Sequence, residues 1–172
     1  MIMVLCLEIP NNGEFRLEFD GKIQKFAQCR LRYSNDSCQT QIYEDYLYIL
    51  VESILGRIKN IPEIKHLELI GTVGKWQEYF YFNSTSIKRN KKEIEQMEKS
   101  IFVSTEYYGT FLYRCFGKIW LEVNKGYSED FAVSPEEYYD SSKNYQILLA
   151  PISEDIIGEW EKMLNKISKK LT

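Results

Sequence analysis

The sequence contains few of the residues and motifs that most often carry catalysis or bind metals and cofactors. Its 172 residues include one histidine, His66, so a Ser-His-Asp arrangement could be built only around that residue, and a histidine-based metal site would lack ligands. The segment 71–75 (GTVGK) resembles part of a phosphate-binding loop, but Leu69 and Trp76 occupy the positions where that loop needs glycine and serine or threonine. No G-x-G-x-x-G motif is present. We therefore expect no catalytic, cofactor-binding or metal site and no enzymatic activity.

Long apolar runs and an excess of basic charge are also missing. No stretch approaches the roughly 18–20 apolar residues that a membrane helix needs. The first ten residues (MIMVLCLEIP) lack the basic start of a signal peptide, so we expect a cytoplasmic protein that does not contact a membrane. With 22 Lys and Arg against 25 Asp and Glu, the net charge of −3 argues against nucleic acid as the main partner.

The four cysteines, Cys6, Cys29, Cys38 and Cys115, show no C-x-x-C spacing. Three of them lie in apolar, strand-like runs, where a reduced cysteine behaves as a small hydrophobic residue. We expect four free thiols, as is usual in a reducing compartment.

Apolar and aromatic residues, in contrast, are abundant. They make up 44% and 15% of the sequence, and 13 residues are tyrosine. A chain of this length and composition can bury a sizeable core, whereas a second domain would have little core of its own. We expect a single globular domain over residues 1–172.

Apolar periodicity predicts two main helices, at about 43–59 and 154–169. In the first, apolar residues recur at i, i+3, i+4 and i+7 over four turns, and Pro62 follows its end. In the second, Ser153 is a suitable N-cap and Trp160 lies on the apolar stripe.

The other apolar runs predict strands that are separated by turn signals such as 11–13 (NNG). They lie at 2–8, 14–19, 26–33, 66–70, 76–82, 101–105, 111–116, 118–123 and 145–150. Several strands before each helix are typical of the α+β class. We expect a mostly antiparallel sheet of about six to eight strands with the two helices packed on it.

The segment 127–140 (YSEDFAVSPEEYYD) is the most distinctive part of the sequence. It combines acidic and aromatic residues, has no Lys or Arg, and lies between two strand-like runs. Acidic side chains attract a basic protein, and tyrosines are frequent at the energetic centre of interfaces. The candidate partner-binding residues are Tyr127, Glu129, Asp130, Phe131, Glu136, Glu137, Tyr138, Tyr139 and Asp140.

Other interpretations of this segment remain open. Adjacent acids in a loop can simply form a solvated surface. A pair such as Glu136 and Glu137 could also hold a metal or serve in acid–base catalysis, if the fold drove their pKa values apart in a cleft. The basic run 86–92 (SIKRNKK) is likewise either a solvated loop face or a nucleic-acid contact.

This small, acidic, histidine-poor α+β chain with an acidic and aromatic segment resembles the immunity proteins of bacterial polymorphic toxins, including those of contact-dependent growth inhibition systems. The resemblance is one of overall character and spans the whole chain. It implies a non-enzymatic protein that binds and blocks a cognate, basic toxin domain, with the acidic and aromatic side chains of 127–140 in the interface. The alternatives are a structural or adaptor module with another partner, and a small carboxylate-dependent hydrolase.

Overall fold

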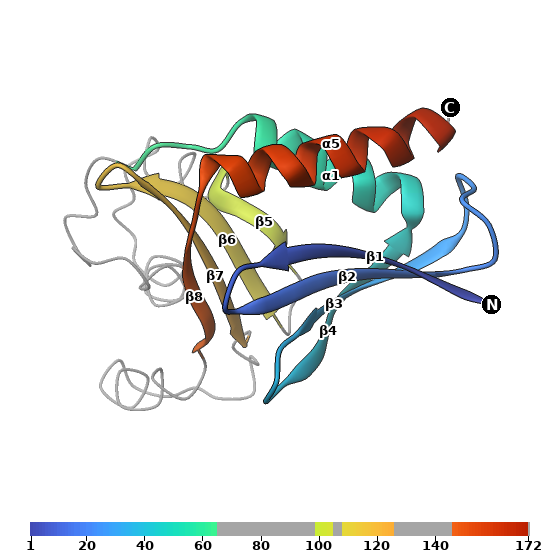
Figure 1. Cartoon of the computed structure of the whole chain (residues 1–172), viewed down its shortest axis with the longest axis horizontal. Helices are drawn as coiled ribbons and strands as arrows, with labels where there is room; N and C mark the ends of the chain where they lie inside the picture. The colour runs from blue at the N-terminus through green and yellow to red at the C-terminus, as the bar shows by residue number, and fades with distance from the viewer. Residues whose placement is uncertain (65–98, 105–107, 126–145, 172) are drawn as a thin grey trace, which may run out of the picture. The chain divides into compact units, whose positions relative to one another are not determined.

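The computed structural model describes residues 1–64, 99–104, 108–125 and 146–171. Within these residues the fold is α+β, as predicted, with two helices and eight strands. The strands form two antiparallel sheets of four strands each, in the orders β1-β2-β3-β4 and β5-β6-β7-β8 (Figure 1). The prediction of one sheet was therefore wrong, although the number of strands agrees with it. The predicted strands at 66–70 and 76–82 lie outside the described residues.

The chain divides into two compact units, one made of Met1–Asn60 with Ile152–Thr172 and one made of Ile61–Pro151. The division follows the two sheets, because the first unit holds β1 to β4 with both helices and the second holds β5 to β7 with nearly all of β8. The single domain expected for residues 1–172 stays a prediction.

The sheet of the first unit is a meander of β1 (Ile2–Ile9), β2 (Gly13–Asp20), β3 (Gln28–Ser34) and β4 (Gln39–Tyr46). In β1 to β3 the odd-numbered side chains face the core, as period-two alternation requires. They include Leu7, Ile9, Phe15, Leu17, Phe19, Cys29, Leu31 and Tyr33. The even-numbered side chains form the opposite face of the sheet, which is mostly polar.

The first hairpin requires glycine at position 13. Gly13 has φ +92°, a left-handed conformation that side chains rarely adopt, and Asn11 before it has φ 63°. A Cβ at Gly13 would also clash with the carbonyl oxygen of Ser34. The turn signal at 11–13 thus marks a position where backbone conformation and space both exclude other residues.

The helix predicted at 43–59 begins later, because residues 43–46 belong to β4. Helix α1 spans Leu47–Lys59, and Tyr46 before it has an extended backbone. Tyr43 and Tyr46 continue the apolar spacing of the helix, but β4 pairs with β3 along its length, and a bulge there places Ile42 in the core. Strand pairing therefore prevails over helical periodicity in this segment.

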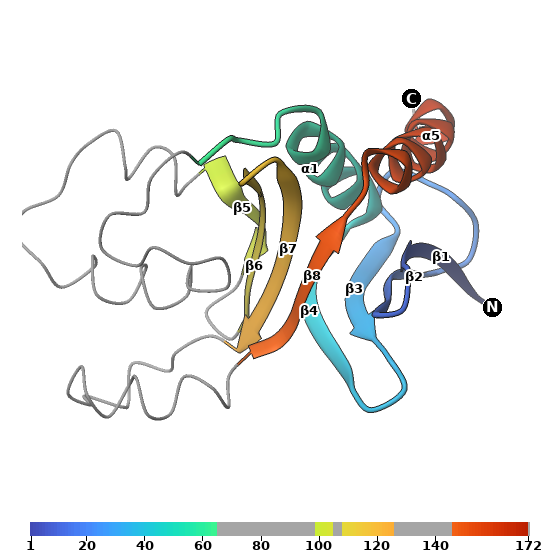
Figure 2. The ribbon, with the colours of Figure 1, turned by 60° about the vertical axis from the view of Figure 1, so that its left-hand side comes forward.

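Helix α5 spans Glu154–Leu171 and begins as predicted. The side chain of Ser153 accepts a hydrogen bond of 3.3 Å from the backbone N–H of Ile156. Helices α1 and α5 lie side by side on the core face of the sheet (Figures 1 and 2). Between them, Ser168 donates a 2.6 Å hydrogen bond to Glu52.

Trp160 joins α5 to the sheet. Its buried ring meets Phe15 edge-on at a centroid distance of 6.3 Å, and its Nε1–H donates a 2.9 Å hydrogen bond to the carbonyl oxygen of Glu8 on β1. The indole thus combines apolar burial with a polar contact that orients the helix.

In the second unit, β5 (Ile101–Ser104), β6 (Tyr108–Cys115), β7 (Lys118–Lys125) and β8 (Gln146–Ile152) form the sheet. Most residues of β6 and β7 are buried on both faces, unlike those of the first sheet. Near its end, β6 also pairs with residues 62–64 through two backbone hydrogen bonds of 2.8 Å.

Replacing Trp160 by alanine should lower the free energy of unfolding by about 3–5 kcal/mol, because a large buried side chain leaves a cavity. Trp160→Phe is the matched control. It keeps a ring against Phe15 but loses the hydrogen bond to Glu8, so it should cost about 1–2 kcal/mol less than the alanine variant. Chemical denaturation measures both. A Trp160→Ala protein that melts within a degree or two of wild type would show that this ring is not core.

All four cysteines are free, as predicted, and Cys29 is fully buried. Burial, with smaller contributions from Glu18 and Glu44, raises the pKa of the Cys29 thiol to about 12. The folded state therefore holds this proton more tightly than the unfolded chain does. The resulting stabilisation is present below about pH 9 and is lost as the pH rises towards 12.

In Cys29→Ala, the fall of the melting temperature between pH 8 and 11 should be shallower than in wild type. An equal slope in both proteins would refute this assignment.

Candidate functional site

The predicted partner-binding segment 127–140 lies outside the described residues, as do His66 and the basic run 86–92. The structure does describe the strands on either side of the acidic segment. Strand β7 ends at Lys125 and β8 begins at Gln146, so the chain leaves one strand of the second sheet and enters another across this segment. The assignment of residues 127–140 to an interface stays a prediction.

Three aromatic rings, those of Phe26, Tyr46 and Tyr48, form a cluster at the surface of the first unit. Phe26 meets each tyrosine edge-on at a centroid distance of 5.7 Å, and the two tyrosine rings stack at 6.4 Å. The ammonium group of Lys25 lies 5.4 Å from the centroid of Tyr48, within the range of a cation–π contact. We call these four residues the aromatic cluster.

Backbone hydrogen bonds hold the aromatic cluster in place. Its residues come from the loop before β3, from the last position of β4 and from the first turn of α1. The N–H of Leu47 donates to the carbonyl of Ala27 at 2.8 Å, and the N–H of Tyr48 donates to that of Lys25 at 3.4 Å. These bonds satisfy N–H groups at the start of α1 that have no partner within the helix. They also fix Phe26 against the tyrosines.

The aromatic cluster is exposed although it is ordered. Phe26 is 66% exposed and Tyr46 is 38% exposed. Large rings that remain in water gain little for folding, and patches of such rings often mark interaction sites. Sequence reasoning missed this site because Phe26 was expected inside a strand and Tyr46 inside a helix. The signal that could have found it is the aromatic pair in 46–48 (YLY), next to a helix start.

The polar face of the first sheet is a set of paired charges. Each ion pair joins an arginine Nε to a glutamate carboxylate oxygen. The distances are 2.5 Å for Arg16 and Glu14, 3.1 Å for Arg32 and Glu18, and 3.4 Å for Arg30 and Glu44. The hydrogen bond from Arg16 lowers the pKa of Glu14, the strongest of the effects on that carboxyl. Because each arginine faces a carboxylate, this face does not present a cationic surface to an anionic ligand.

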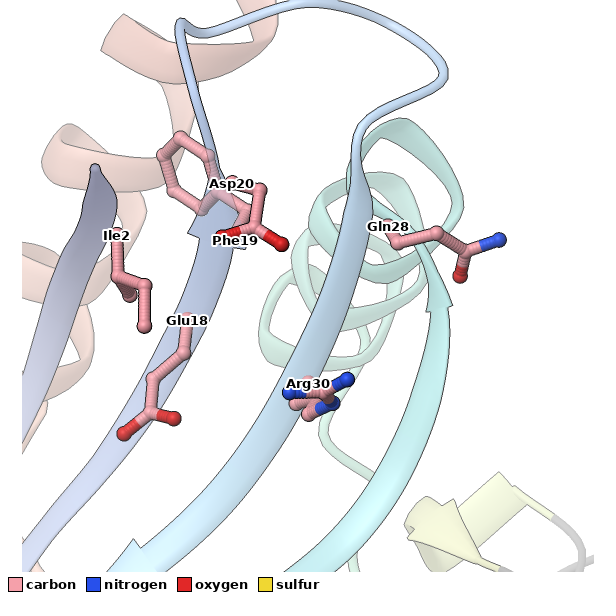
Figure 3. Close-up of a pocket in the computed structure, with 6 residues that line it drawn as sticks. All are labelled: Ile2, Glu18, Phe19, Asp20, Gln28 and Arg30. Atoms are coloured by element: carbon pink, nitrogen blue, oxygen red, sulfur yellow. The ribbon is translucent and has the colours of Figure 1, made fainter.

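A surface hollow lies at one end of this face (Figure 3). It is lined by Ile2, Glu18, Phe19, Asp20, Gln28 and Arg30. Its enclosed volume is about 30 Å³, far below the roughly 300–1,000 Å³ of small-molecule pockets. Figure 3 shows that the polar side chains do not converge, since Gln28 points away from Glu18. The hollow therefore lacks the geometry of a cofactor or substrate site.

The second unit contains a buried carboxylate that sequence reasoning also missed. Glu122 on β7 is fully buried and accepts a 2.6 Å hydrogen bond from the hydroxyl of Tyr113 on β6. Asn124, two residues along β7, is 3% exposed, and its Nδ2 has no hydrogen-bond partner among the described residues. The signal in the sequence is a lone charge in the apolar run 119–123 (IWLEV). Because the Glu122 carboxylate is buried, its role lies inside the second unit rather than at the surface.

Phe116 is a further exposed aromatic residue, on the turn between β6 and β7. It is 80% exposed and has φ 51°, and Gly117 has φ 71°. Two successive left-handed residues define a type I′ hairpin turn, for which Asn-Gly is the preferred sequence. A phenylalanine at the first position is strained and gains nothing from burial, so folding alone does not explain it.

Within the part of the chain that the structure describes, no group of three or more His, Cys, Asp or Glu residues could hold a metal ion. No helix among these residues is long and apolar enough to cross a membrane. Comparison with protein families, curated proteins and solved structures gives no match to this chain.

Phe116→Asn should raise the free energy of unfolding by about 1 kcal/mol, because asparagine tolerates the left-handed backbone that phenylalanine resists. Phe116→Ala is the matched control. Alanine also removes the exposed ring but keeps the strain, so it should leave stability nearly unchanged. Thermal and chemical denaturation measure both variants. If asparagine and alanine have the same effect, backbone strain at residue 116 is not the cause.

Proposed function

We propose that this protein is a non-enzymatic binding protein whose first unit contacts a protein partner through the aromatic cluster. The observation that carries the proposal is an ordered group of three rings, of which Phe26 and Tyr46 are exposed and Tyr48 is half-buried. Backbone hydrogen bonds and ring contacts fix Phe26, Tyr46 and Tyr48 before any partner arrives. A surface that is already ordered loses little conformational entropy on binding, and burial of these rings would supply apolar contact area.

Acidic groups beside the aromatic cluster favour a basic partner. Asp45 precedes Tyr46 in β4, and its carboxylate accepts hydrogen bonds from the Tyr46 N–H at 2.7 Å and from the Tyr43 hydroxyl at 3.3 Å. Exposed Asp20 is the last residue of β2, and Tyr46 is the last residue of β4, where it aligns with Gln28 on β3. Lys25 is engaged with the Tyr48 ring. Exposed rings bordered by carboxylates suit a cationic protein surface.

The specific form of the proposal is an immunity protein that neutralises a cognate bacterial toxin by binding its toxic domain. Its support is the overall resemblance described above, the segment 127–140 and the aromatic cluster. Both features have the same chemistry, aromatic rings with carboxylates, which a basic toxin domain would recognise through apolar contact and charge together.

A growth assay and a binding measurement with purified proteins together test the proposal. A candidate toxic domain, such as one encoded by a toxin gene next to this gene, is produced in bacterial cells with or without the full chain, and wild type should restore growth. Phe26→Ala should weaken the affinity for that domain by about thirtyfold, mainly through faster dissociation, as expected for an interface anchor worth about 2 kcal/mol. Phe116→Ala, which removes an exposed ring elsewhere, is the control. If wild type neither protects cells nor binds the domain, the immunity assignment is wrong; if Phe26→Ala binds as wild type does, the aromatic cluster is not the site.

The acidic segment has its own test in the same system. Reversing Glu136 and Glu137 to lysine should slow association, and the effect should shrink as salt rises, because charge steering is screened. Reversing exposed Asp36 and Glu159 to lysine changes the net charge equally and is the control. If both pairs slow association to the same extent, the total charge matters rather than residues 127–140.

A further inference from the structure

Strand β1 is an edge of the first sheet, since β2 is its only neighbour among the described strands (Figure 2). The direction of its backbone groups follows from two hydrogen bonds. The N–H of Gly21 donates to the carbonyl of Met1 at 2.9 Å. The backbone N–H and C=O groups of the odd-numbered residues of this strand therefore point towards β2. Trp160 donates a hydrogen bond to the carbonyl of Glu8, so the backbone groups of the even-numbered residues point to the open side of the strand.

The open edge is therefore limited to one stretch. Trp160 closes it at Glu8, and the N–H and C=O groups of Ile2, Val4 and Cys6 remain directed away from the sheet. The side chains there are apolar and exposed, with Ile2 at 63% and Val4 at 50%. Residues 2–6 include no charge and no proline, which are the usual means of preventing edge-to-edge pairing. The sequence thus leaves this edge able to accept another strand.

We propose that β1 pairs with β1 of a second copy of this chain, in antiparallel orientation about a twofold axis at Val4. Ile2 of one copy would then lie opposite Cys6 of the other, and Val4 opposite Val4. All three positions present their backbone groups outward, so the pairing forms roughly six hydrogen bonds. The two sheets become one sheet of eight strands, and the edge is closed in both copies.

The chemistry of the edge favours a second copy over another partner strand. An incoming strand must be apolar where it meets Ile2 and Val4, and it must end where Trp160 occupies Glu8. Residues 2–6 of a second copy are apolar, which meets the first condition. The pairing of 2–6 with 2–6 stops before Glu8 in both copies, which meets the second condition. A contact of this kind is self-complementary, as twofold interfaces require.

The charges on the polar face are compatible with this register. Arg16 pairs with Cys6 and Asp20 pairs with Ile2 within one copy, so the dimer places Arg16 and the partner copy's Asp20 in one row across the sheet. Glu18 lies in the row of its own counterpart, but two β1 strands separate them. The spacing of about 14 Å exceeds the screening length of about 8–10 Å at moderate salt. Arg16 and the partner copy's Asp20 are separated by the same two strands, so their attraction is screened as well, and the register creates no charge conflict.

Replacing Val4 by proline tests the pairing directly. The N–H of Val4 points outward, so proline removes no hydrogen bond within the sheet but removes two from the dimer. Sedimentation equilibrium of the full chain should give twice the 20.4 kDa mass for wild type and a shift towards monomer for Val4→Pro. We expect dimerisation to weaken by at least about tenfold. Val4→Lys, which places two ammonium groups on the axis, should have the same effect and serves if the proline variant does not fold.

Gln39→Lys is the matched control, because it adds the same charge to an exposed position on the other edge strand of this sheet, and it should leave the dimer intact. A wild-type protein that stays monomeric at 100 µM overturns the proposal. So does a dimer that persists in both Val4→Pro and Val4→Lys, or one that Gln39→Lys disrupts equally. Dimerisation concerns the isolated chain, so its failure would leave the proposed partner binding unaffected.

Discussion

The first unit depends on the docking of α5 through Trp160. This residue contacts β1 at a carbonyl 152 positions earlier in the sequence and packs on Phe15 from the next strand. The core face of a four-stranded meander is a single apolar layer, which has no stability until something covers it. Helix α1 covers part of it from the adjacent sequence, whereas α5 must come from far along the chain. The arrangement of helices and strands in this unit therefore depends on long-range contacts of α5, with β1 through Trp160 and with α1.

Most elements of the fold could be predicted because local patterns and tertiary packing agree. Ser153 caps a helix with an apolar stripe, and Gly13 occupies a turn that only glycine fits. The errors occur where two patterns compete. Tyr43 and Tyr46 fit a helix by spacing, yet β3 offers a partner strand, and pairing decides the outcome. The split into two sheets could not be predicted, because periodicity within a strand carries no information about which strands become neighbours.

The candidate site was less predictable than the fold. Acidic and aromatic residues that are close in sequence, as in 127–140, are easily recognised. The aromatic cluster joins a loop residue, Phe26, to two residues 20 positions or more away. The pairing of β3 with β4 and the hydrogen bonds at Ala27 and Lys25 bring them together. Glu122 illustrates the opposite difficulty, because a charge in a strand usually points to solvent and this one is buried against Tyr113. In both cases the decisive information lies in packing rather than in residue type.

The contact between Trp160 and β1 has a consequence for the order in which the chain folds. During synthesis, the four strands of the first sheet and α1 emerge well before α5, and the apolar face of that sheet waits for its second helix while more than 90 residues are made. At roughly 5–20 residues per second, this interval lasts several seconds, longer than most elementary folding steps. The nascent sheet would then be a substrate for chaperones that hold exposed apolar strands. Folding of the first unit is thus completed only after the whole second unit has been synthesised.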